Sequence, residues 1–165
     1  MPASSGVPDM NFRRLAIVVT AATYVMLLTG STVVASGADD SCHSWPLCGG
    51  GFALDFTGAN AFSMLHRGTV LVVGLLLLHL LSKAFLRWRS VKGIGPIAVA
   101  AIAALVLQVA VGAGSAISRN AFFDGLHVAI ATLVWSGVLA TTLLTLPRAD
   151  SNLELSRLEI DSTSA

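Results

Sequence analysis

Charge is scarce in this sequence of 165 residues, of which only 12% are charged and 55% are hydrophobic. The mean hydropathy is +0.78. A soluble domain of this size needs far more charge to cover its surface, so the composition indicates an integral membrane protein. The net charge of +1 also lacks the basic excess of nucleic-acid-binding proteins. We therefore expect a lipid membrane, and no nucleic acid, among the partners.

A cleavable signal peptide is not evident either. Arg13 and Arg14 precede an apolar run, but that run has the length of a full membrane span and no clear small-residue cleavage site follows it. We expect it to remain in the mature protein. The sequence has only two cysteines, Cys42 and Cys48. Their short separation is compatible with one local disulfide bond, which would require the non-cytoplasmic side of the membrane.

Four apolar segments are long enough, at about 1.5 Å per residue, to cross a hydrocarbon core of about 30 Å. We expect these spans at residues 12–34, 63–86, 95–117 and 124–146. The fold class is then an all-α integral membrane protein, a four-transmembrane-helix bundle over residues 12–146. Residues 1–11 and 147–165 are polar, and we expect a disordered N-terminus and a polar cytoplasmic tail.

Lysine and arginine are distributed unevenly among the connections, and cytoplasmic loops usually hold the excess. Most of these residues lie on one side: Arg13, Arg14, Lys83, Arg87, Arg89, Lys92, Arg148 and Arg157. Arg67 and Arg119 lie on the other side, which also holds the cysteines. We therefore expect both termini to be cytoplasmic in a multi-pass protein of the cell (plasma) membrane.

Two histidines, His66 and His127, stand about one turn inside the second and fourth spans. These spans run in the same direction, so the two imidazoles should lie at similar depth near the outer face. Two such imidazoles on facing helices can hold a haem iron between them, and helix bundles commonly build sites of this kind. Arg67 and Arg119 would then lie near the haem propionates.

Other interpretations of the histidines remain open. Each imidazole could bind a backbone carbonyl at a helix end, although ionisable groups within a membrane are usually functional. A zinc site is disfavoured because zinc requires three or four ligands and the outer side offers only His43 in addition. His79 lies 13 residues after His66, about 20 Å deeper, and we interpret it as structural or interfacial.

Small and polar residues surround the histidine pair in the sequence. Gly112 and Gly114 would allow close approach of a helix or of a flat macrocycle, and Gln108, one turn further in, needs a polar partner in lipid. The loop from Cys42 to Cys48 has two open interpretations. It is either a structural link that fixes the loop over the site or a redox-active pair that exchanges with a thiol partner.

Several motifs together resemble the heme A synthase family over about residues 12–146. They are Thr29-Gly30-Ser31, Ser36-Gly37-Ala38, Cys42-His43-Ser44-Trp45-Pro46-Leu47-Cys48, His66-Arg67, Gln108 with Gly112, and His127. The resemblance implies oxidation of the C8 methyl group of haem O to the formyl group of haem A during cytochrome oxidase assembly. It also implies His66 and His127 as ligands of haem b or haem O, and Cys42 and Cys48 as the extracytoplasmic cysteine pair.

The sequence departs from the family pattern in two ways. It resembles a half-length member with one histidine pair, so a homodimer would be needed to recreate the tandem arrangement of two bundles. Ser63 occupies the position of a family glutamate three residues before His66, and neither glutamate of the chain lies in a span. Asp124, three residues before His127, is a substitute catalytic carboxylate or, alternatively, a helix N-cap.

We therefore expect a heme A synthase-like oxidoreductase. The alternatives are a non-catalytic haem-binding assembly protein, which the serine at position 63 favours, and a b-type cytochrome subunit. Expected partners are the haem substrate, a second copy of the chain and, as candidates, haem O synthase or oxidase subunits.

Overall fold

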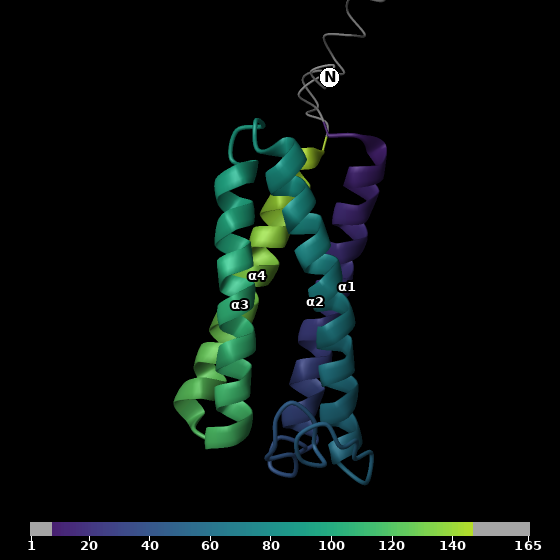
Figure 1. Cartoon of the computed structure of the whole chain (residues 1–165), viewed down its shortest axis with the longest axis vertical. Coiled ribbons are helices and arrows are strands. Elements are labelled where there is room, and N and C mark those ends of the chain that lie inside the picture. The colour runs from purple at the N-terminus through teal and green to yellow at the C-terminus, as the bar shows by residue number, and fades with distance from the viewer. Residues whose placement is uncertain (1–7, 147–165) are drawn as a thin grey trace, which may run out of the picture.

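The computed structural model describes residues 8–146, which form four long helices (Figure 1). The helices are α1 (Met10–Ala35), α2 (Asn60–Trp88), α3 (Ile94–Ser118) and α4 (Ala121–Thr145). Each is long and apolar enough to cross a membrane. The expected all-α fold with four membrane-length helices is confirmed. Residues 1–7 and the polar tail expected at 147–165 lie outside the described residues.

All four helices begin earlier than the hydropathy pattern suggested, and polar side chains cap two of them. The Asp9 carboxylate accepts a hydrogen bond of 2.7 Å from the backbone N–H of Phe12, so α1 begins before position 12. The Asn120 side chain accepts one of 2.9 Å from the backbone N–H of Phe122 at the start of α4. The N-cap considered for Asp124 is therefore wrong: Asn120 is the cap, and Asp124 lies within the first turn.

The helices run alternately up and down, so the start of α1 and the end of α4 lie at the same end of the bundle (Figure 1). Each helix contacts its two neighbours around a square: α1 packs against α2 and α4, and α3 packs against the same two helices. α2 and α4 touch little, because they stand at opposite corners. Side chains of α2 and α4 that point inward therefore face each other across the bundle.

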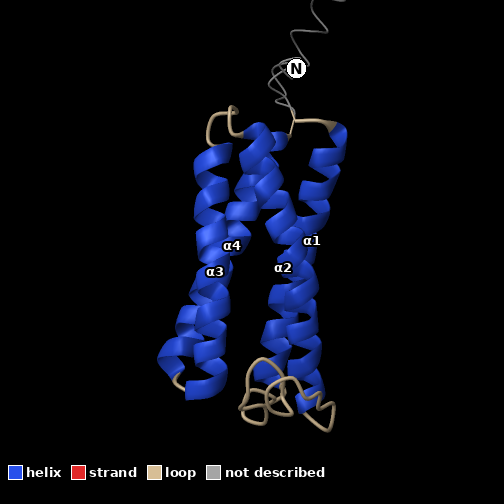
Figure 2. Cartoon of the chain, viewed as in Figure 1, coloured by secondary structure: helices blue, strands red, loops and turns tan. Residues whose placement is uncertain are grey.

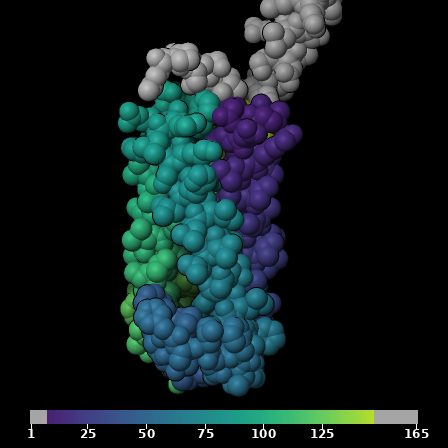
Figure 3. All heavy atoms as spheres, turned by 45° about the vertical axis from the view of Figure 1, so that its right-hand side comes forward, coloured from purple at the N-terminus to yellow at the C-terminus, as the bar shows by residue number. Residues whose placement is uncertain are grey.

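The apolar core occupies mainly one half of the bundle. Most of its side chains come from the first part of α1, the last part of α2, the first part of α3 and the last part of α4, all at the end where the described chain starts. Phe12 and Trp88 pack there with ring centroids 5.9 Å apart. At the other end, the α1–α2 pair and the α3–α4 pair lie apart (Figure 2), and the surface is hollowed above the long α1–α2 loop (Figure 3).

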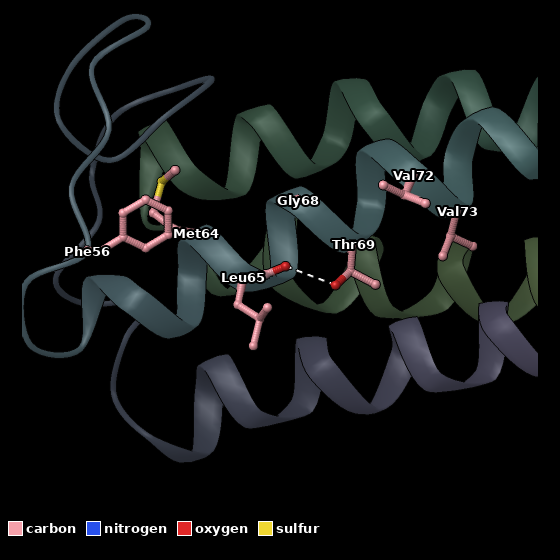
Figure 4. Close-up of a pocket in the computed structure, with 7 residues that line it drawn as sticks. All are labelled: Phe56, Met64, Leu65, Gly68, Thr69, Val72 and Val73. Atoms are coloured by element: carbon pink, nitrogen blue, oxygen red, sulfur yellow. Dashed lines mark hydrogen bonds between the residues drawn. The ribbon is translucent and has the colours of Figure 1, made fainter.

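The outer surfaces of the helices are apolar, as a lipid environment requires. Leu71 and Leu133, for example, are more than half exposed. A shallow groove of about 530 Å³ lies on the outer face of α2, between Phe56 of the loop and α2 side chains as far as Val73 (Figure 4). The hydroxyl of Thr69 in this groove donates to the carbonyl of Leu65 on its own helix. No histidine lines this groove.

Candidate functional site

His66 and His127 occupy corresponding positions on opposite helices of the bundle. His66 lies six residues after Asn60, the first residue of α2. His127 likewise lies six residues after Ala121, the first residue of α4. Both helices run in the same direction (Figure 1) and stand at opposite corners, so the two histidines lie at similar depth. Both side chains are partly buried.

The ring of His66 packs against α1. The Thr29 hydroxyl donates a hydrogen bond of 2.8 Å to the carbonyl of Met26 and lies 3.0 Å from Nδ1 of His66. Because the hydroxyl has one proton and bonds back to its own helix, we assign Thr29 as the acceptor from Nδ1–H of His66. This interaction places the proton on Nδ1 and leaves Nε2 with a lone pair, which is the form of histidine that binds a metal.

Gly30 makes room for this ring. A Cβ atom at Gly30 would lie 3.1 Å from Cε1 of His66, closer than nearly all real contacts of that kind. The adjacent Thr29 and Gly30 therefore orient the His66 imidazole through a hydrogen bond and through close packing, respectively.

The ring of His127 is held by α3 in a similar way. Gln108 and Gly112 are one turn apart on the same face of α3, and both contact the imidazole. The Nε2 atom of Gln108 lies 3.0 Å from Nδ1 and 3.2 Å from Nε2 of His127. A Cβ atom at Gly112 would lie 2.7 Å from Cε1 of His127, which is sterically impossible without movement. The structure thus brings together three residues that the sequence had suggested for one site.

The α1–α2 loop is closed by a disulfide bond between Cys42 and Cys48, which confirms the expected pairing. Arg67 fastens this loop to α2: its Nη1 donates to the carbonyl of Ser44 at 2.7 Å and to that of Pro46 at 2.9 Å. The arginine that follows His66 in sequence therefore holds the disulfide loop over the histidine end of the bundle.

The remaining part of the loop is ordered by Asp55 immediately before α2. Hydrogen bonds from the side chain and backbone N–H of Thr57, and then from the side chain of Asn60, hold the pKa of Asp55 below its usual value. The carboxylate is therefore charged at neutral pH and ties the loop to the first residue of α2.

Three other residues singled out in the sequence lie near the loops at the histidine end of the bundle. Arg119 forms an exposed ion pair with Asp40 at 3.0 Å, which links the α3–α4 turn to the α1–α2 loop. Asp124 is exposed and accepts a hydrogen bond from the Ser115 hydroxyl. Ser63 is buried and donates to the carbonyl of Ala38 at 3.0 Å, so it has a structural role in the loop.

The donor set suits a haem better than a bare metal ion. Within residues 8–146, no group of three or more His, Cys, Asp and Glu side chains could hold a metal. Two imidazoles on opposite helices, each held by a neighbouring helix through a hydrogen bond and a glycine, match the needs of two axial ligands. Most of the apolar core lies in the other half of the bundle, and the surface is hollowed above the α1–α2 loop (Figure 3).

Comparison with known proteins gives a consistent result. The chain is 27% identical over 154 residues to the heme A synthase of Staphylococcus carnosus (strain TM300), covering 92% of this chain and 50% of that protein. It is 29% identical over 140 residues to the heme A synthase of Staphylococcus haemolyticus (strain JCSC1435), covering 81% and 45%. This chain is a distant homologue of heme A synthase.

A third relative, the heme A synthase of Listeria monocytogenes serotype 4a (strain HCC23), is 24% identical over 124 residues, which cover 73% of this chain and 41% of that protein. The chain thus spans about half the length of the curated heme A synthases it matches. No family model matches, and no solved structure matches. The expected relation to heme A synthase at half length is confirmed.

Proposed function

We propose that the chain binds haem between His66 and His127 in the cell membrane, with both termini in the cytoplasm, and that it acts in haem A biosynthesis. The observation that carries this proposal is the matched position of the two histidines on opposite helices. Each is held by a residue of the neighbouring helix, Thr29 or Gln108. The homology to heme A synthase supports haem as the ligand.

The proposed reaction is the oxidation of the C8 methyl group of haem O to a formyl group, as part of cytochrome oxidase assembly. In this proposal His66 and His127 orient the haem, and Gly112 allows the ring of His127 to lie against α3. Arg67 keeps the disulfide loop in place, and its remaining N–H groups, with the Arg119 guanidinium, suit the propionates.

A bound iron porphyrin would supply redox chemistry, and the protein would supply ligation and orientation. Because the chain spans about half the length of its relatives, we propose that two copies associate. One histidine pair would then hold a haem b cofactor and the other the haem O substrate.

A second candidate function is haem binding without oxidation. Ser63, at the position of the family glutamate, is buried and bonds to a loop carbonyl. It therefore acts in packing and cannot replace a carboxylate in proton transfer.

Identification of the extracted haem tests the proposed function. The protein is expressed with a source of haem O, purified, and its haems are separated by chromatography and identified by mass. We expect haem A or its hydroxylated precursor from the wild type, and a lower haem content when either histidine becomes alanine. His79→Ala is the matched control, because His79 is exposed on the same helix as His66 and should leave the haem content unchanged. Unaltered haem O or haem B alone would instead support the non-catalytic function.

Asp124 is the proposed catalytic carboxylate, and its replacement separates chemistry from binding. It lies three residues before His127, at the rim of the histidine end. We expect Asp124→Asn to abolish formation of haem A while haem remains bound, because the amide cannot accept a proton. The control is Asp40→Asn, which removes another exposed rim carboxylate, the one paired with Arg119. Unchanged conversion by Asp124→Asn would show that Asp124 has no catalytic role.

A further inference from the structure

The two histidines are held by chemically different neighbours. Thr29 accepts from Nδ1–H of His66, and within residues 8–146 no hydrogen bond engages Nε2 of that ring. Gln108 instead places its amide nitrogen near both ring nitrogens of His127, at 3.0 Å and 3.2 Å. The two imidazoles are therefore not equally available to a metal.

The amide of Gln108 leaves two possibilities for His127, and both obstruct its Nε2 atom. An N–H group can donate only to an unprotonated ring nitrogen. If it donates to Nδ1, the proton of the neutral ring is on Nε2. If it donates to Nε2, the lone pair needed by a metal is already used. His127 becomes a ligand only when the amide turns away or presents its oxygen to Nδ1–H.

The amide has a reason to adopt more than one orientation. Its oxygen, Oε1 of Gln108, is buried and has no hydrogen-bond partner among residues 8–146. Exchange of the amide oxygen and nitrogen would let Oε1 accept from Nδ1–H of His127. Because a buried amide oxygen without a partner is unfavourable, the amide is not fixed in its present orientation.

We propose that Gln108 competes with the haem iron for His127, so that His66 is the fixed axial ligand and His127 is the exchangeable one. This inference rests on the proposed haem site. The site would then have a means of release, because Gln108 would hold the His127 nitrogen when the haem leaves. Gly112 leaves room for the His127 ring beside α3, within reach of Gln108.

The competition is tested without catalysis by the binding of carbon monoxide to the purified protein containing ferrous haem b. Carbon monoxide must displace one axial histidine, so its binding rate reports how readily that ligand leaves. We expect Gln108→Leu to slow carbon monoxide binding about fivefold, the size expected for one neutral hydrogen bond. In the His127→Ala background, where the exchangeable ligand is absent, Gln108→Leu should have no effect. An equal rate for Gln108→Leu and the wild type would overturn the inference.

The fixed role of His66 has its own test. We expect His66→Ala to lose more haem during purification than His127→Ala, and the reverse order would contradict the assignment. In the haem-free protein, ¹⁵N spectra of the imidazoles should show an unprotonated Nε2 in His66, and Thr29→Val should shift that signal. Thr69→Val is the matched control, because Thr69 also donates to a carbonyl of its own helix but contacts no histidine.

The outcomes also separate this inference from the proposed function. If the protein binds haem and leaves haem O unchanged, but Gln108→Leu slows carbon monoxide binding, only the proposed oxidation is wrong. If the protein forms haem A, but Gln108→Leu and the wild type bind carbon monoxide at the same rate, only the inference about Gln108 is wrong. A wild-type chain that takes up no haem would overturn both.

Discussion

Replacement of Gly112 by alanine is expected to lower haem affinity about 10- to 100-fold, the range seen when groups that orient metal ligands are changed. The new Cβ atom would lie 2.7 Å from Cε1 of His127 and 3.1 Å from its Nδ1. One of the two must move, and the imidazole is less constrained than the backbone of α3. The ring would turn away from its present position against α3. Titration of the purified protein with haem, followed by absorption spectroscopy, measures the change.

Gly125→Ala is the matched control for this prediction. Gly125 lies on α4, two residues before His127, and a Cβ atom there would have no heavy atom within 4 Å. Both substitutions add one methyl group to a membrane-length helix near the same histidine, and alanine favours the helix in each case. We expect normal haem affinity for Gly125→Ala. An equal loss in both variants would mean that helix conformation, rather than contact with His127, determines binding.

The fold could be predicted from the sequence because its four spans are separated by polar connections. Hydropathy places each span to within a few residues, but it does not see the caps that set the ends. Asn120 begins α4 before the apolar run does, and this shortens the expected loop around Arg119. The up-and-down order then follows from crossing a membrane repeatedly.

The histidine pair could also be singled out from sequence, because ionisable residues at matched depth are rare in apolar helices. The contact of Thr29 and Gly30 with His66 could not. Both belong to a motif that carries the family resemblance, but no periodicity indicates that Thr29 contacts a residue 37 positions later. The contact depends on the rotation of α1 against α2, which packing determines. A glycine next to a hydroxyl residue at the depth of a histidine is the signal that could have pointed to them.

Arg67 illustrates a different limit. Its charge suggested propionate binding, and that role stays a prediction, but the structure shows an additional one. Its Nη1 binds two carbonyls of the disulfide loop, an interaction that the sequence could not reveal because the loop has no regular backbone geometry. Ser63 is similar, since its hydroxyl serves the carbonyl of Ala38 in the same loop region.

Arg67→Ala should therefore detach the disulfide loop from α2. Two charge-assisted hydrogen bonds from a partly buried guanidinium would be lost, each worth about 1.5 to 3 kcal/mol. We expect the loop between the cysteines and α2 to be cleaved by added protease at least about tenfold faster, since local opening free energies translate directly into cleavage rates. The measurement uses the haem-free protein in detergent, so that any loss of propionate binding does not contribute.

Arg119→Ala is the control, because it also removes an arginine that holds this loop. Its ion pair with Asp40 is exposed, with 53% and 78% of the two side chains accessible, and exposed pairs contribute at most about 1 kcal/mol. Cleavage should therefore change little. If Arg119→Ala accelerated cleavage as much as Arg67→Ala, the loop would be held mainly by its contact with the α3–α4 turn. The two carbonyl bonds of Arg67 would then be incidental, and the disulfide loop would respond to movements of α3 and α4 rather than to the residue next to His66.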